Sequence, residues 1–207
     1  MIKRIIVSLL LFLPVALYAQ GSNAVAMLEN AIKKIESDAA VQMTFTYNVY
    51  DAGGALQFSD DGSLKLDGEC YALLLSPMKL WCDGRTQWSY MDQTNEVYIT
   101  DADSDEAQVY NPVYLMGLYK KGYTCSVESV GGKNNITLLA KGEQDFEKVV
   151  LALDAKTLQP VAMQIFVEGQ GYTTVDITSY KSDYNFDKRV YACPLEDFPA
   201  AEIVDMR

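Results

Sequence analysis

The sequence contains no histidine among its 207 residues. This absence removes the Ser-His and Cys-His nucleophile pairs and the commonest general base of active sites. No Gly-x-Ser-x-Gly elbow or phosphate loop occurs, and Gly169-Gln170-Gly171 lies between two predicted strands, where a hairpin turn is expected. A pair of carboxylates could still hydrolyse glycosides, but nothing singles out such a pair. We therefore predict a protein that is not an enzyme and needs no cofactor.

Basic residues are also few, with 17 Lys and Arg against 28 Asp and Glu and a formal charge of −11. Such a surface repels phosphate backbones, so nucleic acid is not an expected partner, and solubility alone explains the acidity. The stretch from Asp101 to Glu106 begins like a calcium loop, but its sixth residue is not glycine and Pro112 replaces the chelating glutamate. Without histidine or closely spaced cysteines, zinc is not expected either, so we predict no metal.

Only one long hydrophobic run is present, and it lies at the start of the chain. Ile5 to Leu17 is almost wholly apolar, follows Lys3 and Arg4, and precedes a small residue, Ala19. This pattern is typical of a secretory signal peptide, and the run is too short to span a bilayer comfortably. The alternative is a retained membrane anchor. We predict that residues 1–19 are removed and that residues 20–207 form one exported domain.

Four cysteines follow the predicted signal peptide. An even number in an oxidising compartment favours two disulfides. A hairpin with a three-residue loop at positions 75–77 would place Cys70 directly opposite Cys82, within bonding range. We therefore predict a Cys70–Cys82 disulfide and, by elimination, a Cys125–Cys193 disulfide.

The hydrophobic periodicity predicts one amphipathic helix followed by strands. Apolar residues recur at helical spacing over 24–35, with Asn23 as the candidate cap. From Val41 to Tyr50 the period changes to two, and turn signals then separate short strands in sequence order. These strands predict one antiparallel sheet through the whole chain. The further strands are expected near 64–66, 71–75, 79–82, 88–90, 97–99, 125–130, 136–140, 149–154, 161–168 and 172–180.

A second, short helix interrupts the strands. Asn111-Pro112 can begin a helix, the residues from Val113 to Tyr119 are nearly all apolar, and Lys120-Lys121-Gly122 ends it. A helix that is apolar almost all round must be covered. It is either a plug in the end of a filled barrel or a lid over an apolar cavity, and the segment alone favours the plug.

The predicted sheet has more apolar surface than two helices can cover. Hydrophobic residues make up 49% of the sequence, which includes 14 Tyr and 2 Trp. A second sheet, helices or a ligand must cover the apolar face of such a sheet. The shortage of helices is typical of a ligand-binding space, although closure into a filled barrel explains it equally well.

Three segments together resemble the outer-membrane lipoprotein carrier protein family, which is LolA-like. They are the Met43-Thr44-Phe45-Thr46 strand after the first helix, the segment from Cys82 to Tyr90 with its Asp-Gly-x-x-x-Trp-x-Tyr pattern, and the ending from Phe198 to Arg207. The resemblance implies a mainly β fold with a few helices: an unclosed antiparallel β-barrel, or half-barrel, with a helical lid. We expect the lipid-binding cavity to be lined by Phe45, Tyr47, Leu64, Leu66, Trp88, Tyr90, Tyr114, Leu115, Leu118, Ile165 and Ile177.

The resemblance also implies a function. Members carry lipoproteins through the periplasm of Gram-negative bacteria, from an inner-membrane release complex to an outer-membrane acceptor, and shield their acyl chains. Each buried methylene is worth about 0.8 kcal/mol, so an acyl chain cannot cross water unaided. We expect a monomer with this role; a lipid-binding module or an envelope-stress sensor of the same fold is the alternative. One feature departs from the family: Asp67-Gly68 stands where an Arg-Pro pair is expected, so the arginine that latches the lid is absent or moved.

Overall fold

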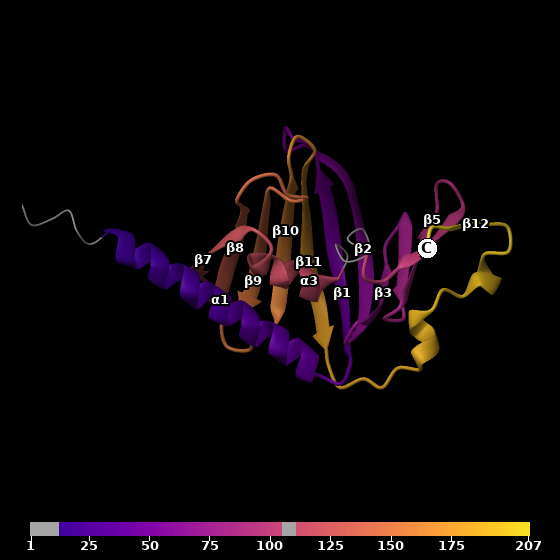
Figure 1. The fold of residues 1–207 in the computed structure, drawn as a ribbon, viewed down its shortest axis with the longest axis horizontal. Helices are drawn as coiled ribbons and strands as arrows, with labels where there is room; N and C mark the ends of the chain where they lie inside the picture. Colours follow the sequence, from indigo (N-terminus) through magenta and orange to yellow (C-terminus); the bar gives the residue numbers. More distant parts are fainter. Residues whose placement is uncertain (1–12, 105–110) are drawn as a thin grey trace, which may run out of the picture.

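The computed structural model describes residues 13–104 and 111–207. Their strands form a single twelve-stranded sheet in the order β12-β6-β5-β4-β3-β2-β1-β11-β10-β9-β8-β7. The sheet does not close between β12 and β7 in the described part of the chain, so the architecture is an open half-barrel, as predicted (Figure 1). The strands are β1 Val41–Tyr50, β2 Leu56–Asp67, β3 Cys70–Leu74, β4 Met78–Cys82, β5 Thr86–Met91, β6 Glu96–Asp101, β7 Tyr123–Val130, β8 Lys133–Ala140, β9 Lys148–Asp154, β10 Pro160–Val167, β11 Gly171–Lys181 and β12 Glu202–Asp205.

Every predicted strand is present, and most boundaries differ by no more than a few residues, but β2 begins at Leu56, eight residues before the predicted start at position 64. Neighbouring strands pair antiparallel, most of them joined by short turns, except that β12 adds to the sheet parallel to β6. The sequence analysis did not predict β12 as a strand. The central pair, β1 with β11, joins the two halves of the meander, so strands far apart in sequence become neighbours.

The first helix, α1, runs from Leu13 to Ser37 and lies across one face of the sheet beside β7 (Figure 1). Ala24, Leu28, Ala31 and Ile35 are buried at helical spacing, which confirms the predicted apolar stripe. The predicted cap at Asn23 is wrong, because the helix begins earlier and passes without interruption through the expected cleavage position. Within residues 13–104 and 111–207, no helix is both long and apolar enough to cross a membrane.

The segment between β6 and β7 crosses the sheet, since these strands lie near opposite ends of it. It carries α3, Pro112–Met116, and the 3₁₀ helix η1, Gly117–Lys120. The Asn111 side chain accepts a hydrogen bond from the Val113 N–H at 2.9 Å, which confirms the predicted start of this helix. Residues 105 and 106 of the predicted acidic loop lie outside the described residues, as do residues 1–12 of the predicted signal peptide.

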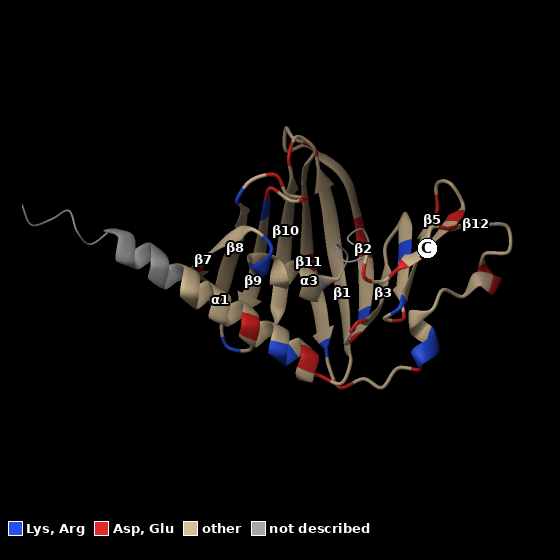
Figure 2. Cartoon of the chain, viewed as in Figure 1, with Lys and Arg blue, Asp and Glu red and all other residues tan. Residues whose placement is uncertain are grey.

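The two faces of the sheet carry separate apolar clusters. The main core lies on the face covered by α1 and α3, where alternate strand residues such as Met43, Phe45 and Tyr47 are buried. Among the central strands β1 and β10 carry no charged residue, whereas β2 carries Asp60, Asp61, Lys65 and Asp67; other acidic residues lie in turns and loops (Figure 2). On the other face, the segment from residue 182 to the C-terminus packs Tyr191 and Phe198 against Trp81.

The predicted pairing of cysteines is wrong, and all four are free thiols. In the β3–β4 hairpin Cys82 lies opposite Tyr71, one residue from the predicted register. Because side chains alternate along a strand, this shift separates the two thiols: Cys82 joins the main core and Cys70 packs in the second cluster. Cys125 and Cys193 are likewise divided between the two clusters, so they cannot pair.

Candidate functional site

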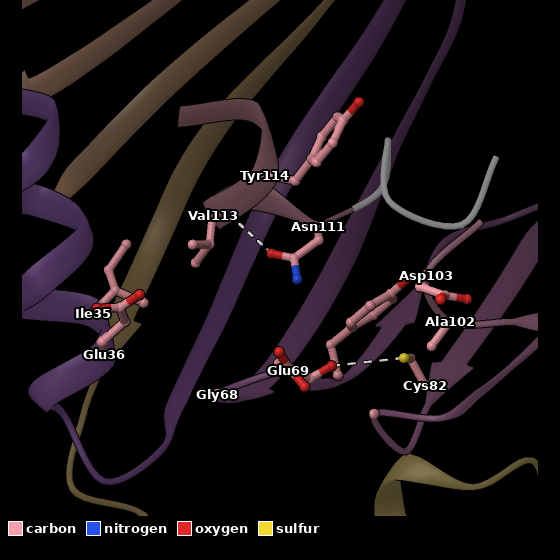
Figure 3. A pocket seen from close by; sticks show the side chains of 12 residues that line it. Ile35, Glu36, Gly68, Glu69, Cys82, Ala102, Asp103, Asn111, Val113 and Tyr114 are labelled. Carbon is pink, nitrogen blue, oxygen red and sulfur yellow. Dashed lines mark hydrogen bonds between the residues drawn. The ribbon is translucent and has the colours of Figure 1, made fainter. Parts of the chain in front are cut away.

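A pocket of about 360 Å³ lies where α1, α3 and one end of the sheet meet (Figure 3). Its volume is at the lower end of the range for ligand sites, which is about 300–1,000 Å³. Three groups of elements form the walls: the C-terminal end of α1, the turns after β2 and β4, and the start of α3 with the residues that follow β6. The pocket is lined by Ile35, Glu36, Gly68, Glu69, Tyr71, Cys82, Gly84, Ala102, Asp103, Asn111, Val113 and Tyr114.

Local sequence signals place the turns of this wall. Gly68 and Gly84 adopt φ values of +60° and +89°, a conformation that glycine takes without a steric penalty. The Asp83 carboxylate accepts hydrogen bonds from the N–H groups of Arg85 and Thr86, at 2.9 and 2.8 Å. In an antiparallel meander alternate turns lie at the same end of the sheet, so these two turns meet at the pocket.

The inner side of the pocket is continuous with the main core. Cys82 and Tyr71 are core members, and Ile35 and Val113 pack within or against the same cluster. Beyond them the side chains of Leu115, Met116 and Leu118 are buried between the helices and the sheet. The pocket is therefore a space at one end of the half-barrel that adjoins the main core and is not filled by the described side chains.

A row of polar groups crosses the core face next to the pocket. Register places Tyr71, Cys82, Gln87 and Thr100 side by side on neighbouring strands. The Tyr71 hydroxyl donates to Gln87, which is only 3% exposed, and the Gln87 amide reaches Ser89 Oγ at 3.4 Å. Thr100 Oγ1 is buried without a hydrogen-bond partner in the described structure. Burial raises the pKa of the Cys82 thiol, whose Sγ lies 3.6 Å from the Glu69 carbonyl oxygen.

The predicted cavity residues fall into three groups. Tyr114 lines the pocket itself. The structure brings eight others together in or against the main core, where they pack on one another: Phe45, Tyr47, Leu64, Leu66, Leu115, Leu118, Ile165 and Ile177.

Trp88 and Tyr90 are not brought to this face. Both pack with the second cluster, where the rings of Tyr90 and Phe198 lie 4.2 Å apart between centroids. Sequence reasoning missed Glu36, Glu69 and Cys82 as pocket residues. For Glu69 and Cys82 a signal was available, because they lie next to the Asp67-Gly68 and Asp83-Gly84 turns, which the meander places at the same end of the sheet.

A family model described as outer membrane lipoprotein carrier protein LolA matches residues 24–170. This match spans well over half of the sequence. The chain belongs to the LolA family. Among curated proteins no match was found. In the described part of this LolA-family chain, no group of three or more Cys, Asp or Glu side chains is arranged to hold a metal ion.

Solved structures share the fold at very low sequence identity. An uncharacterized conserved protein from Thermus thermophilus aligns with a TM-score of 0.54 and 9% identity, over 87% of this chain and 98% of its own. A DUF1329 family protein from Desulfovibrio piger gives 0.48 and 10%, over 84% and 97%. A LolA superfamily protein from Nitrosomonas europaea gives 0.41 and 10%, over 82% and 97%. The first of these demonstrates a common fold.

The lid region of this LolA-family protein is fastened without an arginine from the turn after β2. The position expected for that arginine holds Asp67, which forms an ion pair with Lys188 of the C-terminal segment at 3.0 Å. The Tyr119 hydroxyl of η1 instead donates to Glu29 on α1 at 3.1 Å, and Lys121 Nζ lies 4.3 Å from the centroid of the Tyr114 ring. Buried leucines of α3 and η1 supply the rest of the attachment.

Proposed function

We propose that the protein is a periplasmic carrier that binds the acyl chains of lipoproteins between the sheet and its helical cover. The observation that carries this proposal is the unfilled pocket at the edge of α3, continuous with an apolar core inside an unclosed barrel. Membership of the LolA family supports the same role. Each methylene that leaves water contributes about 0.8 kcal/mol, so a pocket that lengthens enough to bury a few more methylenes binds an acyl chain substantially more tightly.

Binding of a whole acyl chain requires α3 to move. The pocket is at the lower end of ligand-site volumes, and Leu115 and Leu118 occupy the space beyond it. We infer that an entering chain displaces these two side chains and takes their place against the strands. The exposed Tyr119–Glu29 hydrogen bond is a weak attachment, which allows this exchange.

The proposal includes export and exchange between two partners. Residues 1–19 act as a signal peptide, residues 20–207 form the carrier domain, and an inner-membrane release complex and an outer-membrane acceptor deliver and remove the cargo. A lipid-binding module without a transfer step is the second candidate. The observation that favours it is Asp67, which is bound to Lys188 where the family places its lid arginine.

Native mass spectrometry of protein purified from its own periplasm tests the ligand class, and we expect a bound lipid or lipoprotein. Titration with a fluorescent acyl probe tests the site. Val113→Asp introduces a charge at the pocket, in the first turn of α3, where a carboxylate is compatible with the helix. We expect probe affinity to fall at least tenfold, whereas the matched control Val130→Asp, on an exposed residue of β7, leaves it unchanged. Absence of saturable binding by the wild type contradicts the proposal.

A further inference from the structure

The two edges of the twelve-stranded sheet differ in how they are protected. One edge ends in β12, which is only four residues long and includes the acidic Glu202 and Asp205. A strand that is short and charged is a poor template for pairing with another chain. The other edge is β7, which has eight residues and pairs with β8 without a register shift. It contains no proline, lysine or arginine, and Glu128 is its one charged residue, so β7 lacks most of the usual protection.

The turn after β7 determines which backbone groups of this strand point away from the sheet. The two glycines that follow β7 have φ values of +59° and +75°, as in a tight two-residue hairpin turn, and Val130 pairs with Lys133 across them. The residues that close such a turn form a hydrogen-bonded pair, and these pairs alternate with non-hydrogen-bonded pairs along an antiparallel ladder. The N–H and C=O groups of Val127 and Ser129 therefore point outward from the edge.

Helix α1 covers only the first part of this edge (Figure 1). A methyl group added at Gly21 of α1 would lie 3.3 Å from the carbonyl oxygen of Cys125, so the helix passes close beside β7 there. Beyond this crossing Val127 is half-buried against the main core, and the three residues after it are exposed. The open edge thus consists of Val127–Val130. It is as long as the pairing between β12 and β6, which shows that four residues suffice for strand addition in this sheet.

The charge of Glu128 determines which strand can pair with this edge. Its side chain is exposed, and Lys133, diagonally across on β8, forms no ion pair with it in the described structure. If two copies of the protein paired through the outward groups of Val127 and Ser129, Glu128 of each copy would lie directly opposite Glu128 of the other. Like charges in this position destabilise a sheet, whereas a lysine or arginine there stabilises it.

We propose that the Val127–Val130 edge of β7 binds an extended segment of a partner protein that carries a basic residue opposite Glu128. The outward groups of Val127 and Ser129 form the backbone hydrogen bonds of the added strand, and charge complementarity at Glu128 selects the partner and disfavours a second copy. No residue of β7 is among the described residues that line the pocket, so this binding does not depend on the proposed binding of acyl chains.

Two cyclic β-hairpin peptides test the site, because a preorganised strand loses less entropy on binding than a flexible one. The outer strand of the first reads Thr-Val-Lys-Val-Thr, and the second has Glu in place of Lys. Each is titrated into isotopically labelled protein at low ionic strength while the amide resonances of β7 are followed by NMR. We expect saturable shifts at Val127 and Ser129, and about three- to tenfold tighter binding of the lysine hairpin.

Three variants assign the effect to this edge. Glu128→Lys should reverse the preference between the two hairpins. Ser129→Pro removes an outward N–H and should abolish binding with little change in melting temperature, because an edge strand tolerates proline where its nitrogen faces solvent. The control Glu143→Lys makes the same charge change at an exposed loop residue and should keep the wild-type preference.

Three results would overturn the proposal. They are the absence of saturable shifts in β7, equal affinity of the wild type for the two hairpins, and retention of binding by Ser129→Pro. Shifts of the same amides that depend on the concentration of the wild type alone would identify a second copy as the occupant, and they too would overturn the choice of a basic partner segment.

Discussion

Replacement of Leu115 by Asp measures how firmly α3 is packed in the ligand-free protein. The Leu115 side chain is 3% exposed and belongs to the main core. Truncation of a buried leucine to alanine costs about 2–5 kcal/mol, and a carboxylate in the same place also loses its hydration. We therefore expect the variant to lose at least about 3 kcal/mol of unfolding free energy.

The expected change in melting temperature is large enough to measure. For a chain of this length 1 kcal/mol corresponds to about 2–4 °C, so Leu115→Asp should lower the melting temperature by at least about 6 °C. Burial raises the pKa of the introduced carboxyl, so the deficit should shrink as the pH falls and the group is protonated. The control is Leu139→Asp, at a residue that is 47% exposed, and it should change stability by no more than about 0.5 kcal/mol.

The assay pairs thermal unfolding of delipidated protein with binding of the fluorescent acyl probe. If α3 is docked as the structure has it, Leu115→Asp reduces both stability and probe affinity. A melting temperature equal to that of Leu139→Asp would refute the packing argument, because it would mean that α3 is already a displaced lid when no ligand is bound. Unchanged probe affinity would remove α3 from the binding site.

Three further outcomes follow from other contacts. Tyr180→Phe removes the 3.0 Å hydrogen bond to Asp38 and should lower the unfolding free energy by about 1–3 kcal/mol in thermal unfolding. Because burial raises the pKa of Tyr180, the stability of the wild type should also fall above about pH 10, and that of the variant should fall less steeply. Burial raises the pKa of all four thiols, so iodoacetamide at pH 8 should label them slowly in the native protein. Protein that is unfolded but not reduced should gain four labels in mass spectrometry, and fewer labels would reveal a disulfide. Gly171→Ala would place a methyl group on the Tyr50 carbonyl oxygen and should lower the melting temperature far more than Gly132→Ala, where the space is open; equal effects would contradict the close approach of these strands.

Local pattern determined which segments become strands and helices. The alternation of Val41 to Tyr50, the turn glycines 68 and 84, and the cap at Asn111 each act through backbone preference and nearest neighbours, so they could be predicted from the sequence. The half-barrel was predictable from the family resemblance in addition to these signals. The location of the pocket was not.

Tertiary structure decided which face each strand residue occupies. The alternation of Trp88 and Tyr90 shows that they share a face, but only the packing of residues 182–207 against that face places them outside the main core. The Cys70–Cys82 register differed by one residue from the prediction, because the length of the hairpin loop sets it and the sequence permits neighbouring lengths.

Local sequence signals also did not predict which distant strands pair with each other. The C-terminal strand β12 is short and joins β6 in parallel, after the chain has passed along the second cluster. The pocket depends on α1, α3 and two turns that come together only when β1 pairs with β11 and the segment after β6 crosses the sheet. Sequence alone determined most of the elements and their apolar stripes, though not β12, because these depend on neighbours along the chain. The unfilled space between them was decided by the tertiary structure, because it depends on how distant elements meet.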